Sequence, residues 1–302
     1  MKIENNISLK DLNSFKLESA ARFFLKAAGG GDIVAGIEWA REKGKPFVLV
    51  GSASNVIFGS AVYEGLVIKN AWSRIRIEKE GVVSVSSGTE MAAIVQYFAG
   101  SGFSGLEWAG GLPGTIGGAV RGNAGAFGGE TKDSVLSVRS TAALRNNAEC
   151  EFGYRNSIFK RNGEVILEVE LGYEKSLRSY VRQAVDNCIA YRKEHLPLEY
   201  PSAGSFFKNI PLEQAPENAR EEFKAVIKND PFPLIPVAAI IAGLGLMGRQ
   251  IGGAQVSEKH PNFIINKGNA TASDILAVAE LMEKEVFDKH GIKLEREVQL
   301  IV

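Results

Sequence analysis

The sequence predicts an α+β protein with more than one domain. Short apolar runs typical of strands alternate with amphipathic segments of helical length along most of the chain. Its 302 residues exceed the roughly 100 to 200 residues of an ordinary domain. Pro197 and Pro201 interrupt the pattern after a long amphipathic segment. We therefore place a domain boundary there and expect two or three domains in all.

The composition argues against several classes of partner. Thirty-five Lys and Arg balance 35 Asp and Glu, so no overall field attracts nucleic acid or an anionic membrane. The N-terminus lacks a signal-peptide core, and no apolar run approaches the ~20 residues of a membrane span. The two cysteines and the widely spaced His195, His260 and His290 favour neither a disulfide framework nor a metal site. We expect a cytoplasmic protein without a metal ion.

The first part of the chain has the elements of a small α+β domain. Asp32 is predicted to be the N-cap of a helix from Ile33 to about Lys43. The next apolar runs predict strands at 47–50 and 66–69.

The middle of the chain contains more strands than helices. One helix is predicted from about Thr89 to Ala99, and a longer one runs from Leu177 towards His195 with apolar residues on one face. The other apolar runs are predicted strands, at 75–79, 82–86, 135–144, 149–152 and 165–171.

The last third contains a glycine pattern that imitates a dinucleotide fingerprint. Residues 243–248 satisfy G-x-G-x-x-G, but that pattern is informative only between a strand and a helix. Residues 237–242 predict a short helix instead, so we reject a Rossmann fold. Thr271 predicts the cap of a long helix through Val286, and residues 294–301 predict a final strand.

Two segments of small residues are candidates for binding phosphate. Residues 105–130 hold ten of the 33 glycines and only three charged residues. Glycine lets the backbone turn tightly, and successive N–H groups of small residues can wrap an anion. Residues 51–57 follow a predicted strand and add Ser54 and Asn55 as donors. The alternatives are an ordinary surface loop for the first segment and a plain turn for the second.

The order of the motifs resembles that of the UDP-N-acetylenolpyruvoylglucosamine reductases, bacterial flavoenzymes of peptidoglycan precursor synthesis. Residues 113–120 and 123–130 resemble their flavin-binding signature, and 154–160 matches their Tyr-Arg-x-Ser-x-Phe motif. Residues 201–209 resemble their serine motif. Further similar segments are 13–15, 260–263 and 294–298. Arg155 and Ser205 are only 50 residues apart, so the match is to the shorter type, which lacks an inserted tyrosine-bearing segment.

This resemblance implies a two-subdomain FAD-binding fold of the vanillyl-alcohol oxidase type and a C-terminal α+β substrate-binding domain. The implied domains are residues 1–70, 71–198 and 199–302, with the last strand able to return to the FAD domain. The implied reaction is the NADPH-dependent, FAD-mediated reduction of UDP-N-acetyl-3-O-enolpyruvylglucosamine to UDP-N-acetylmuramate by a monomer. The alternatives are another FAD oxidoreductase of this fold and a non-catalytic nucleotide-binding relative.

The resemblance also assigns roles to residues. Arg155 is expected to hold the substrate carboxylate, Ser205 to donate a proton to the adjacent carbon, and Glu297 to complete the carboxylate site. Expected contacts to non-covalent FAD are Gly51, Ser52, Ala53, Ser54, Asn55, Pro113, Gly114, Thr115, Gly117, Gly118, Ala119, Asn123 and Gly125. Expected substrate contacts are Tyr154, Lys208, Asn209 and His260.

Overall fold

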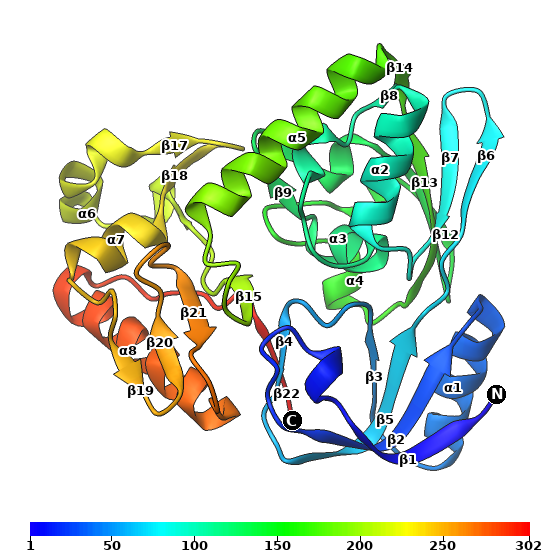
Figure 1. Cartoon of the computed structure of the whole chain (residues 1–302), viewed down its shortest axis with the longest axis horizontal. Helices are drawn as coiled ribbons and strands as arrows, with labels where there is room; N and C mark the ends of the chain where they lie inside the picture. The colour runs from blue at the N-terminus through cyan, green and yellow to red at the C-terminus, as the bar shows by residue number, and fades with distance from the viewer. The chain divides into compact units, whose positions relative to one another are not determined.

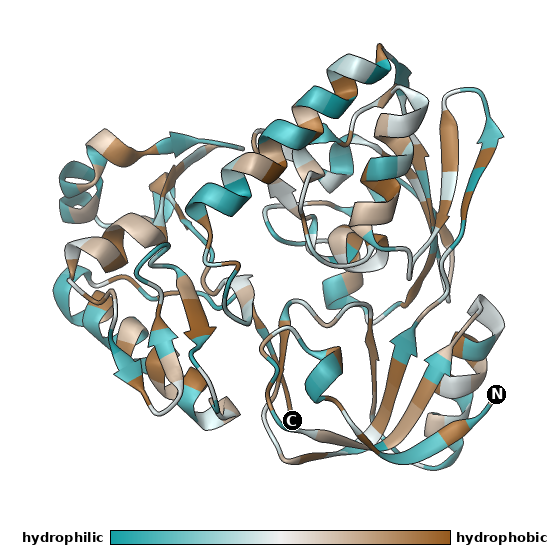
Figure 2. Cartoon of the chain, viewed as in Figure 1, coloured by the Kyte–Doolittle hydropathy of each residue, from teal (hydrophilic) through white to brown (hydrophobic).

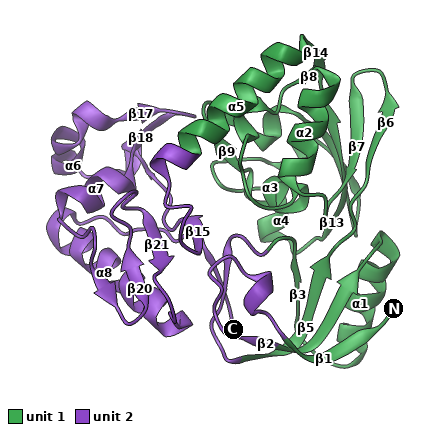
Figure 3. Cartoon of the chain, in the orientation of Figure 1, with its two compact units in different colours: residues 1–7, 21–52, 62–192 green, residues 8–20, 53–61, 193–302 purple.

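The chain folds into two units, each assembled from segments that are far apart in the sequence (Figure 3). The computed structural model describes all residues from 1 to 302. Unit 1 consists of residues 1–7, 21–52 and 62–192, and unit 2 consists of residues 8–20, 53–61 and 193–302. The domain limits expected at residues 70 and 198 remain a prediction.

Unit 1 contains a four-stranded sheet in the order β1-β2-β5-β3, with β3 and β5 parallel (Figure 1). Helix α1 (Gly30–Glu42) buries one face against this sheet. A Cβ atom at Gly36 would lie 2.6 Å from Leu25 Cδ2, so glycine lets α1 approach β2 closely. The strands are β1 (Ile3–Ser8), β2 (Ala20–Ala27), β3 (Phe47–Val50) and β5 (Val62–Asn70).

The N-cap predicted at Asp32 is wrong. Helix α1 begins at Gly30, and its N-cap is Gly29 in an extended conformation. The Asp32 carboxylate instead accepts a hydrogen bond of 2.9 Å from the backbone N–H of Ala28. An acidic side chain in the first turn is favourable for the helix dipole without being the cap.

The second sheet of unit 1 is antiparallel, in the order β12-β11-β13-β7-β6. Helix α2 (Met91–Ser101) contributes to the same core and ends at Gly102, which has a left-handed φ of +73°. The strands are β6 (Ile75–Lys79), β7 (Val82–Ser86), β11 (Val135–Ser140), β12 (Leu144–Asn146) and β13 (Ile166–Gly172).

The strand predicted at 149–152 is wrong, because residues Ala148–Cys150 form a 3-10 helix whose end has Glu151 at φ +45°. The run predicted at 135–144 is divided into β11 and β12, which pair with each other. Four short elements complete unit 1: β8 (Phe103–Ser104) with β14 (Glu174–Lys175), and β9 (Gly125–Ala126) with β10 (Gly129–Glu130). Helices α3 (Ile116–Gly122) and α4 (Ile158–Arg161) are also short.

Helix α5 (Arg178–His195) confirms the predicted long helix and part of its apolar face, because Val181 and Val185 lie in the core of unit 1 and Ala184, Cys188 and Ile189 are partly buried. Only Val181 and Val185 are buried, whereas Leu177 just before the helix and Tyr180 within it are mostly exposed. Figure 2 shows hydrophilic and hydrophobic bands alternating along α5. Neither this helix nor any other combines the length and apolar character needed to cross a membrane.

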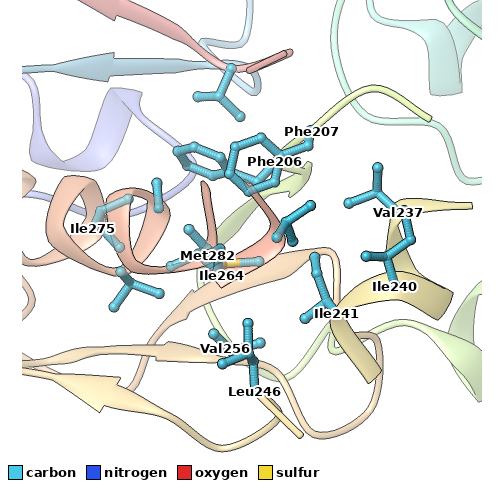
Figure 4. Close-up of a cluster of buried hydrophobic side chains, with 14 of the residues drawn as sticks. Phe206, Phe207, Val237, Ile240, Ile241, Leu246, Val256, Ile264, Ile275 and Met282 are labelled. Carbon is cyan, nitrogen blue, oxygen red and sulfur yellow. The ribbon is translucent and has the colours of Figure 1, made fainter. Parts of the chain in front are cut away.

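Unit 2 is built around the antiparallel sheet β15-β21-β20-β19 and helix α8 (Ala272–His290). Figure 4 shows Phe206 and Phe207 among aliphatic side chains of α7, α8, β20 and β21. The strands are β15 (Ser202–Ser205), β19 (Gln250–Ile251), β20 (Ala254–Val256) and β21 (Phe263–Asn266). Smaller sheets join β16 (Ile210–Pro211), β18 (Pro233–Ile235) and β17 (Lys228–Asn229), and β4 (Val56–Phe58) with β22 (Gln299–Ile301).

The helices of unit 2 agree with the sequence pattern. Helix α7 (Val237–Gly243) occupies the position at which a Rossmann fingerprint would require a strand, so rejecting that fold is confirmed. Thr271 caps α8 through a capping box with Asp274, and Gly291 ends it at φ +70°. Helix α6 (Glu217–Glu222) was not predicted. The final strand is shorter than predicted, because β22 includes only residues 299–301.

Candidate active site

The two small-residue segments meet within unit 1 at Gly51 and Thr115. A Cβ atom at Gly51 would lie 2.3 Å from Thr115 Oγ1, so only glycine permits this approach. The Lys69 ammonium donates to the carbonyl oxygen of Gly51, and Ser52 Oγ lies 3.1 Å from Glu90 Oε1. Burial lowers the pKa of Lys69, while the charge of Glu90 opposes that shift. The beginning of the loop after β3 therefore lies against Thr115 in the middle of the glycine-rich segment, and Lys69 and Glu90 hold it there.

The glycine-rich segment contains helix α3 rather than a continuous loop. Thr115 is its N-cap and accepts a hydrogen bond of 3.5 Å from the N–H of Gly118. Gly114 precedes it with a left-handed φ of +107°. A Cβ atom at Gly117 would lie 2.8 Å from the carbonyl oxygen of Ser87, whereas at Gly118 it would meet only Thr115 Oγ1, at 3.8 Å. Gly117 is therefore required by the fold itself, and Gly118 is not.

The second half of the loop after β3, beginning at Ala53, belongs to unit 2. Ala53 is 5% exposed and has a φ of +46°, a conformation that glycine adopts more easily. Its carbonyl oxygen accepts from the N–H of Ser14, and Ser14 Oγ donates to the carbonyl oxygen of Ser54 at 3.4 Å. Asn55 Nδ2 donates to the carbonyl oxygen of Glu297 at 3.1 Å. The predicted cofactor residue Asn55 and the predicted catalytic residue Glu297 are thus neighbours.

The side-chain amide of Asn123 forms hydrogen bonds with other residues of the protein. It is fully buried with a φ of +43°, and its Nδ2 donates to Glu130 Oε1 at 3.1 Å and to the carbonyl oxygen of Gly153 at 3.0 Å. Its Oδ1 accepts from the N–H of Lys132 at 3.1 Å. The amide therefore joins the glycine-rich segment to the turn that carries Arg155.

Arg155 lies in a tight hairpin turn with a left-handed backbone. The N–H groups of Gly153 and Asn156 each donate to the other's carbonyl oxygen, at 3.0 and 3.1 Å. Arg155 itself has a φ of +51°, which costs about 1–2 kcal/mol for a residue other than glycine. Lys160 Nζ donates to the Arg155 carbonyl oxygen at 2.7 Å. A hydrogen bond from a charged donor contributes about 1.5–3 kcal/mol, which is enough to offset that cost.

The Arg155 side chain is also oriented. Its Nη2 donates to the carbonyl oxygen of Gly125 at 2.8 Å, and its guanidinium lies 5.1 Å from the centre of the Tyr154 ring. Both predicted members of the Tyr-Arg motif are therefore in contact with each other, and Arg155 also contacts the glycine-rich segment.

Ser205 lies at the end of β15, next to a β-bulge in unit 2. The register of β15 against β21 shifts between Ser202 and Ser205, and Gly204 in the bulge has a φ of +78°. A Cβ atom at Gly204 would have no neighbour within 4 Å, so glycine is needed there for its conformation rather than for space. Bulges of this kind change the direction of a side chain.

Backbone pairing brings Glu297 to the segment after Ser205. The N–H of Glu297 donates to the carbonyl oxygen of Phe206 at 2.8 Å, and Lys208 N–H donates to the carbonyl oxygen of Glu295 at 2.9 Å. Asn262 completes this arrangement, because its buried amide exchanges two hydrogen bonds with the backbone of Phe207. Ser205 and Glu297, which are 92 residues apart in the sequence, are held on adjacent backbone segments.

The predicted substrate residues Lys208, Asn209 and His260 lie in the same unit. The ammonium of Lys208 pairs with the Glu295 carboxylate, and Asn209 Oδ1 accepts from the N–H of Val237 at 3.1 Å at the start of α7. The His260 ring packs 4.8 Å from that of Phe263.

Burial, followed by the positive charge of Lys228, lowers the pKa of His260 to about 4. Its imidazole is therefore neutral at pH 7. The buried Nδ1 atom makes no hydrogen bond within the protein.

Similarity to known proteins agrees with this geometry. A relative from Clostridium novyi (strain NT), described as UDP-N-acetylenolpyruvoylglucosamine reductase, is 33% identical over 99% of this chain and 92% of its own length. The reductase from Geobacillus kaustophilus (strain HTA426) is 36% identical over 86% of this chain and 80% of its own.

The chain belongs to the UDP-N-acetylenolpyruvoylglucosamine reductase family.

The crystal structure of the UDP-N-acetylenolpyruvylglucosamine reductase from Thermus caldophilus matches all of both chains, with a TM-score of 0.78 and 26% identity. The family model of the reductase C-terminal domain matches residues 196–301, and that of an FAD binding domain matches residues 21–143. The predicted reductase family, its α+β FAD-binding fold, its function as a reductase and its FAD cofactor are confirmed.

The residues of unit 1 fit a bound flavin dinucleotide of this reductase family. Gly51 allows the two small-residue segments to approach each other, and Gly114 provides a left-handed turn. The space beside Gly118, where a Cβ atom would meet only Thr115 Oγ1, is not filled by other protein atoms. Backbone groups of such segments are suited to a diphosphate.

The family motifs do not reveal every residue that supports this site. The sequence pattern marks Lys69 only as the end of a strand, and no pattern marks Glu90. Lys160 belongs to a motif that gives it no role. Lys69 and Glu90 contact residues that are far away in the sequence, and Lys160 contacts a carbonyl oxygen of a nearby turn. Contacts of these kinds leave no periodic pattern in the sequence.

Proposed function

We propose that this chain reduces UDP-N-acetyl-3-O-enolpyruvylglucosamine to UDP-N-acetylmuramate, with NADPH as the source of hydride, through Arg155, Ser205 and Glu297. The observation that carries the proposal is the pairing of the serine motif (201–209) with the segment 294–298, which reads Leu-Glu-Arg-Glu-Val and resembles the Leu-Glu-x-Glu-Val motif of the reductases. The hydrogen bond from Glu297 to Phe206 holds both motifs on adjacent backbone segments. When bound, FAD would supply the redox chemistry of the reaction, which is the transfer of hydride from NADPH to the substrate.

Arg155 binds and orients the carboxylate of the enolpyruvyl group. Its planar guanidinium can form two charge-assisted hydrogen bonds with a carboxylate. Addition of hydride to the terminal carbon of the substrate moves negative charge onto this carboxylate. A cation fixed in advance, by its hydrogen bond to Gly125 and its contact with Tyr154, stabilises that charge without reorganisation.

Ser205 donates a proton to the carbon next to the carboxylate. A serine hydroxyl is a weak acid, so it can act only towards a strongly basic carbon within hydrogen-bond reach. The bulge at Gly204 sets the direction of the Ser205 side chain. Glu297 completes the carboxylate site from the neighbouring segment.

Unit 1, together with residues 53–55 of the loop after β3, holds the cofactor. Unit 2 provides most of the contacts to the uridine nucleotide of the substrate. FAD would be held by Gly51, Ser52, Ala53, Ser54, Asn55, Pro113, Gly114, Thr115, Gly117, Gly118, Ala119 and Gly125, with Asn123 acting through the structure of its segment. Lys208, Asn209, His260 and Tyr154 contact the UDP-sugar. The chain acts as a cytoplasmic monomer, with functional domains at residues 1–70, 71–198 and 199–302.

An assay of the purified protein tests this proposal. With FAD, NADPH and the enolpyruvyl substrate, we expect UDP-N-acetylmuramate by mass spectrometry, with one NADPH consumed for each product. In D₂O, one deuterium should appear on the carbon next to the carboxylate, while hydride from 4-deuterated NADPH should appear on the terminal carbon. Oxidation of NADPH without formation of this product would support the alternative of another FAD oxidoreductase.

A further inference from the structure

The hairpin of Arg155 is attached to its surroundings on both sides. On the preceding side, Asn123 Nδ2 donates to the carbonyl oxygen of Gly153. On the following side, the buried Ser157 Oγ donates to the carbonyl oxygen of Arg121 at 2.8 Å. These bonds hold the ends of the turn, but neither contacts Arg155 itself. The left-handed conformation therefore requires a further contact at the centre of the turn.

Lys160 provides that contact from a fixed base. It lies on helix α4, whose N-cap is Ser157 and whose Phe159 is 1% exposed in the core of unit 1. From this helix its ammonium donates to the carbonyl oxygen of Arg155 at 2.7 Å. The direction of that carbonyl depends on the backbone conformation of Arg155, so the bond selects the left-handed turn over alternatives.

We propose that Lys160 is a positioning residue for Arg155, and this inference rests on the proposed role of Arg155 in binding the substrate carboxylate. The lysine stabilises the strained turn, the turn aims the guanidinium at Gly125, and the fixed guanidinium meets the carboxylate. Without the ammonium, the backbone of Arg155 can relax to an unstrained conformation, and the guanidinium no longer has a fixed position.

Equilibrium binding separates this role from a general structural one. The FAD-loaded protein is titrated, without NADPH, with UDP-N-acetyl-3-O-enolpyruvylglucosamine and with UDP-N-acetylglucosamine, which lacks the carboxylate. We expect Lys160→Met to bind the first ligand about tenfold more weakly, as for loss of one charge-assisted contact, and the second unchanged. Lys160→Arg, which keeps the charged donor, should recover most of the affinity. Lys175→Met is the matched control, because Lys175 pairs with Glu80 on the surface of unit 1.

A double-mutant cycle with Arg155→Ala identifies the route of the effect. If Lys160 acts through Arg155, adding Lys160→Met to Arg155→Ala should cause no further loss of affinity. A further tenfold loss would mean that Lys160 meets the ligand directly and would overturn the inference. Equal weakening for both ligands, or no weakening for either, would also overturn it. If the wild-type protein binds the two ligands equally well, the role proposed for Arg155 fails first, and the inference fails with it.

Discussion

Arg155 and Ser205 are held in place by different means. Arg155 lies in a strained hairpin of unit 1, whose conformation depends on side chains such as Asn123 and Lys160. Ser205 lies in unit 2 at the end of a strand, where backbone pairing with Phe263 fixes it. Hydrogen bonds from other side chains can hold a residue in an unusual orientation, but a single substitution of one of those side chains removes the support. Main-chain hydrogen bonds hold a residue whatever its own side chain is, so they tolerate substitution of that residue.

The largest expected effect comes from Ser205→Ala. Because the backbone holds this position, the variant should fold with unchanged stability and bind FAD. Reduction of the flavin by NADPH should keep nearly the wild-type rate, since that step needs no proton from Ser205. Reduction of the enolpyruvyl substrate should slow by roughly a hundred- to ten-thousandfold, the usual contribution of a positioned acid. Stopped-flow absorbance of the flavin measures both steps.

Two other stopped-flow outcomes would change this view. Equal slowing of both half-reactions would mean that the Ser205 side chain supports the structure, which would contradict the view that main-chain hydrogen bonds alone hold this position. Normal rates in both would mean that another group donates the proton.

The second expected effect is a dependence of the free energy of unfolding on pH. It arises from His260 in unit 2, the unit that contains all three histidines. The pKa of His260 is about 4 in the folded chain, against an ordinary value of 6.5. Between these values the unfolded state binds more protons, so stability falls as the pH decreases and levels off below about 4. From pH 7 to pH 5, His260 should contribute about 2 kcal/mol to the loss of unfolding free energy.

Urea unfolding at several pH values measures this contribution. The comparison is between the wild-type chain and His260→Gln, which cannot titrate but keeps a polar side chain. The variant should lose about 2 kcal/mol less between pH 7 and pH 5. Parallel stability curves would show that His260 is solvated and titrates normally.

The smallest expected effect tests the cofactor surface of unit 1. Gly118→Ala adds a methyl group that meets only Thr115 Oγ1 within the protein, so the chain should fold and its helix should be slightly stabilised. If FAD approaches this backbone closely, its affinity should fall about tenfold, or about 1.4 kcal/mol. Flavin fluorescence titration of the apoprotein measures that affinity.

Gly122→Ala is the matched control for this experiment. Gly122 is in the same helix, and a Cβ atom there has no neighbour within 4 Å. It should keep the affinity of the wild-type chain for FAD. Gly117 would be a poor choice, because its methyl group would collide with the backbone of Ser87. Unchanged affinity in Gly118→Ala would place the flavin away from this face of α3.

Several elements were predictable because their signals are local. The Thr271 capping box and Gly291 bracket α8, and the strands β6 and β7 have the predicted limits. The order of the motifs along the chain is enough to identify the reductase family. Two other local predictions failed. Gly29 rather than Asp32 is the N-cap of α1, and Ala148–Cys150 form a 3-10 helix where a strand was predicted at 149–152.

The sequence by itself determined the family, the main helices and strands, and the kinds of residue needed for carboxylate binding and proton donation. Only the tertiary structure decided that Arg155 adopts a left-handed turn supported by Lys160, and that Glu297 is joined to Phe206. The physical reason is that such hydrogen bonds link backbone groups to partners chosen by the fold. Lys160 and Phe206 both lie inside recognised motifs, but neither residue type nor spacing shows which atom each one bonds, so the contact exists only once the chain has folded.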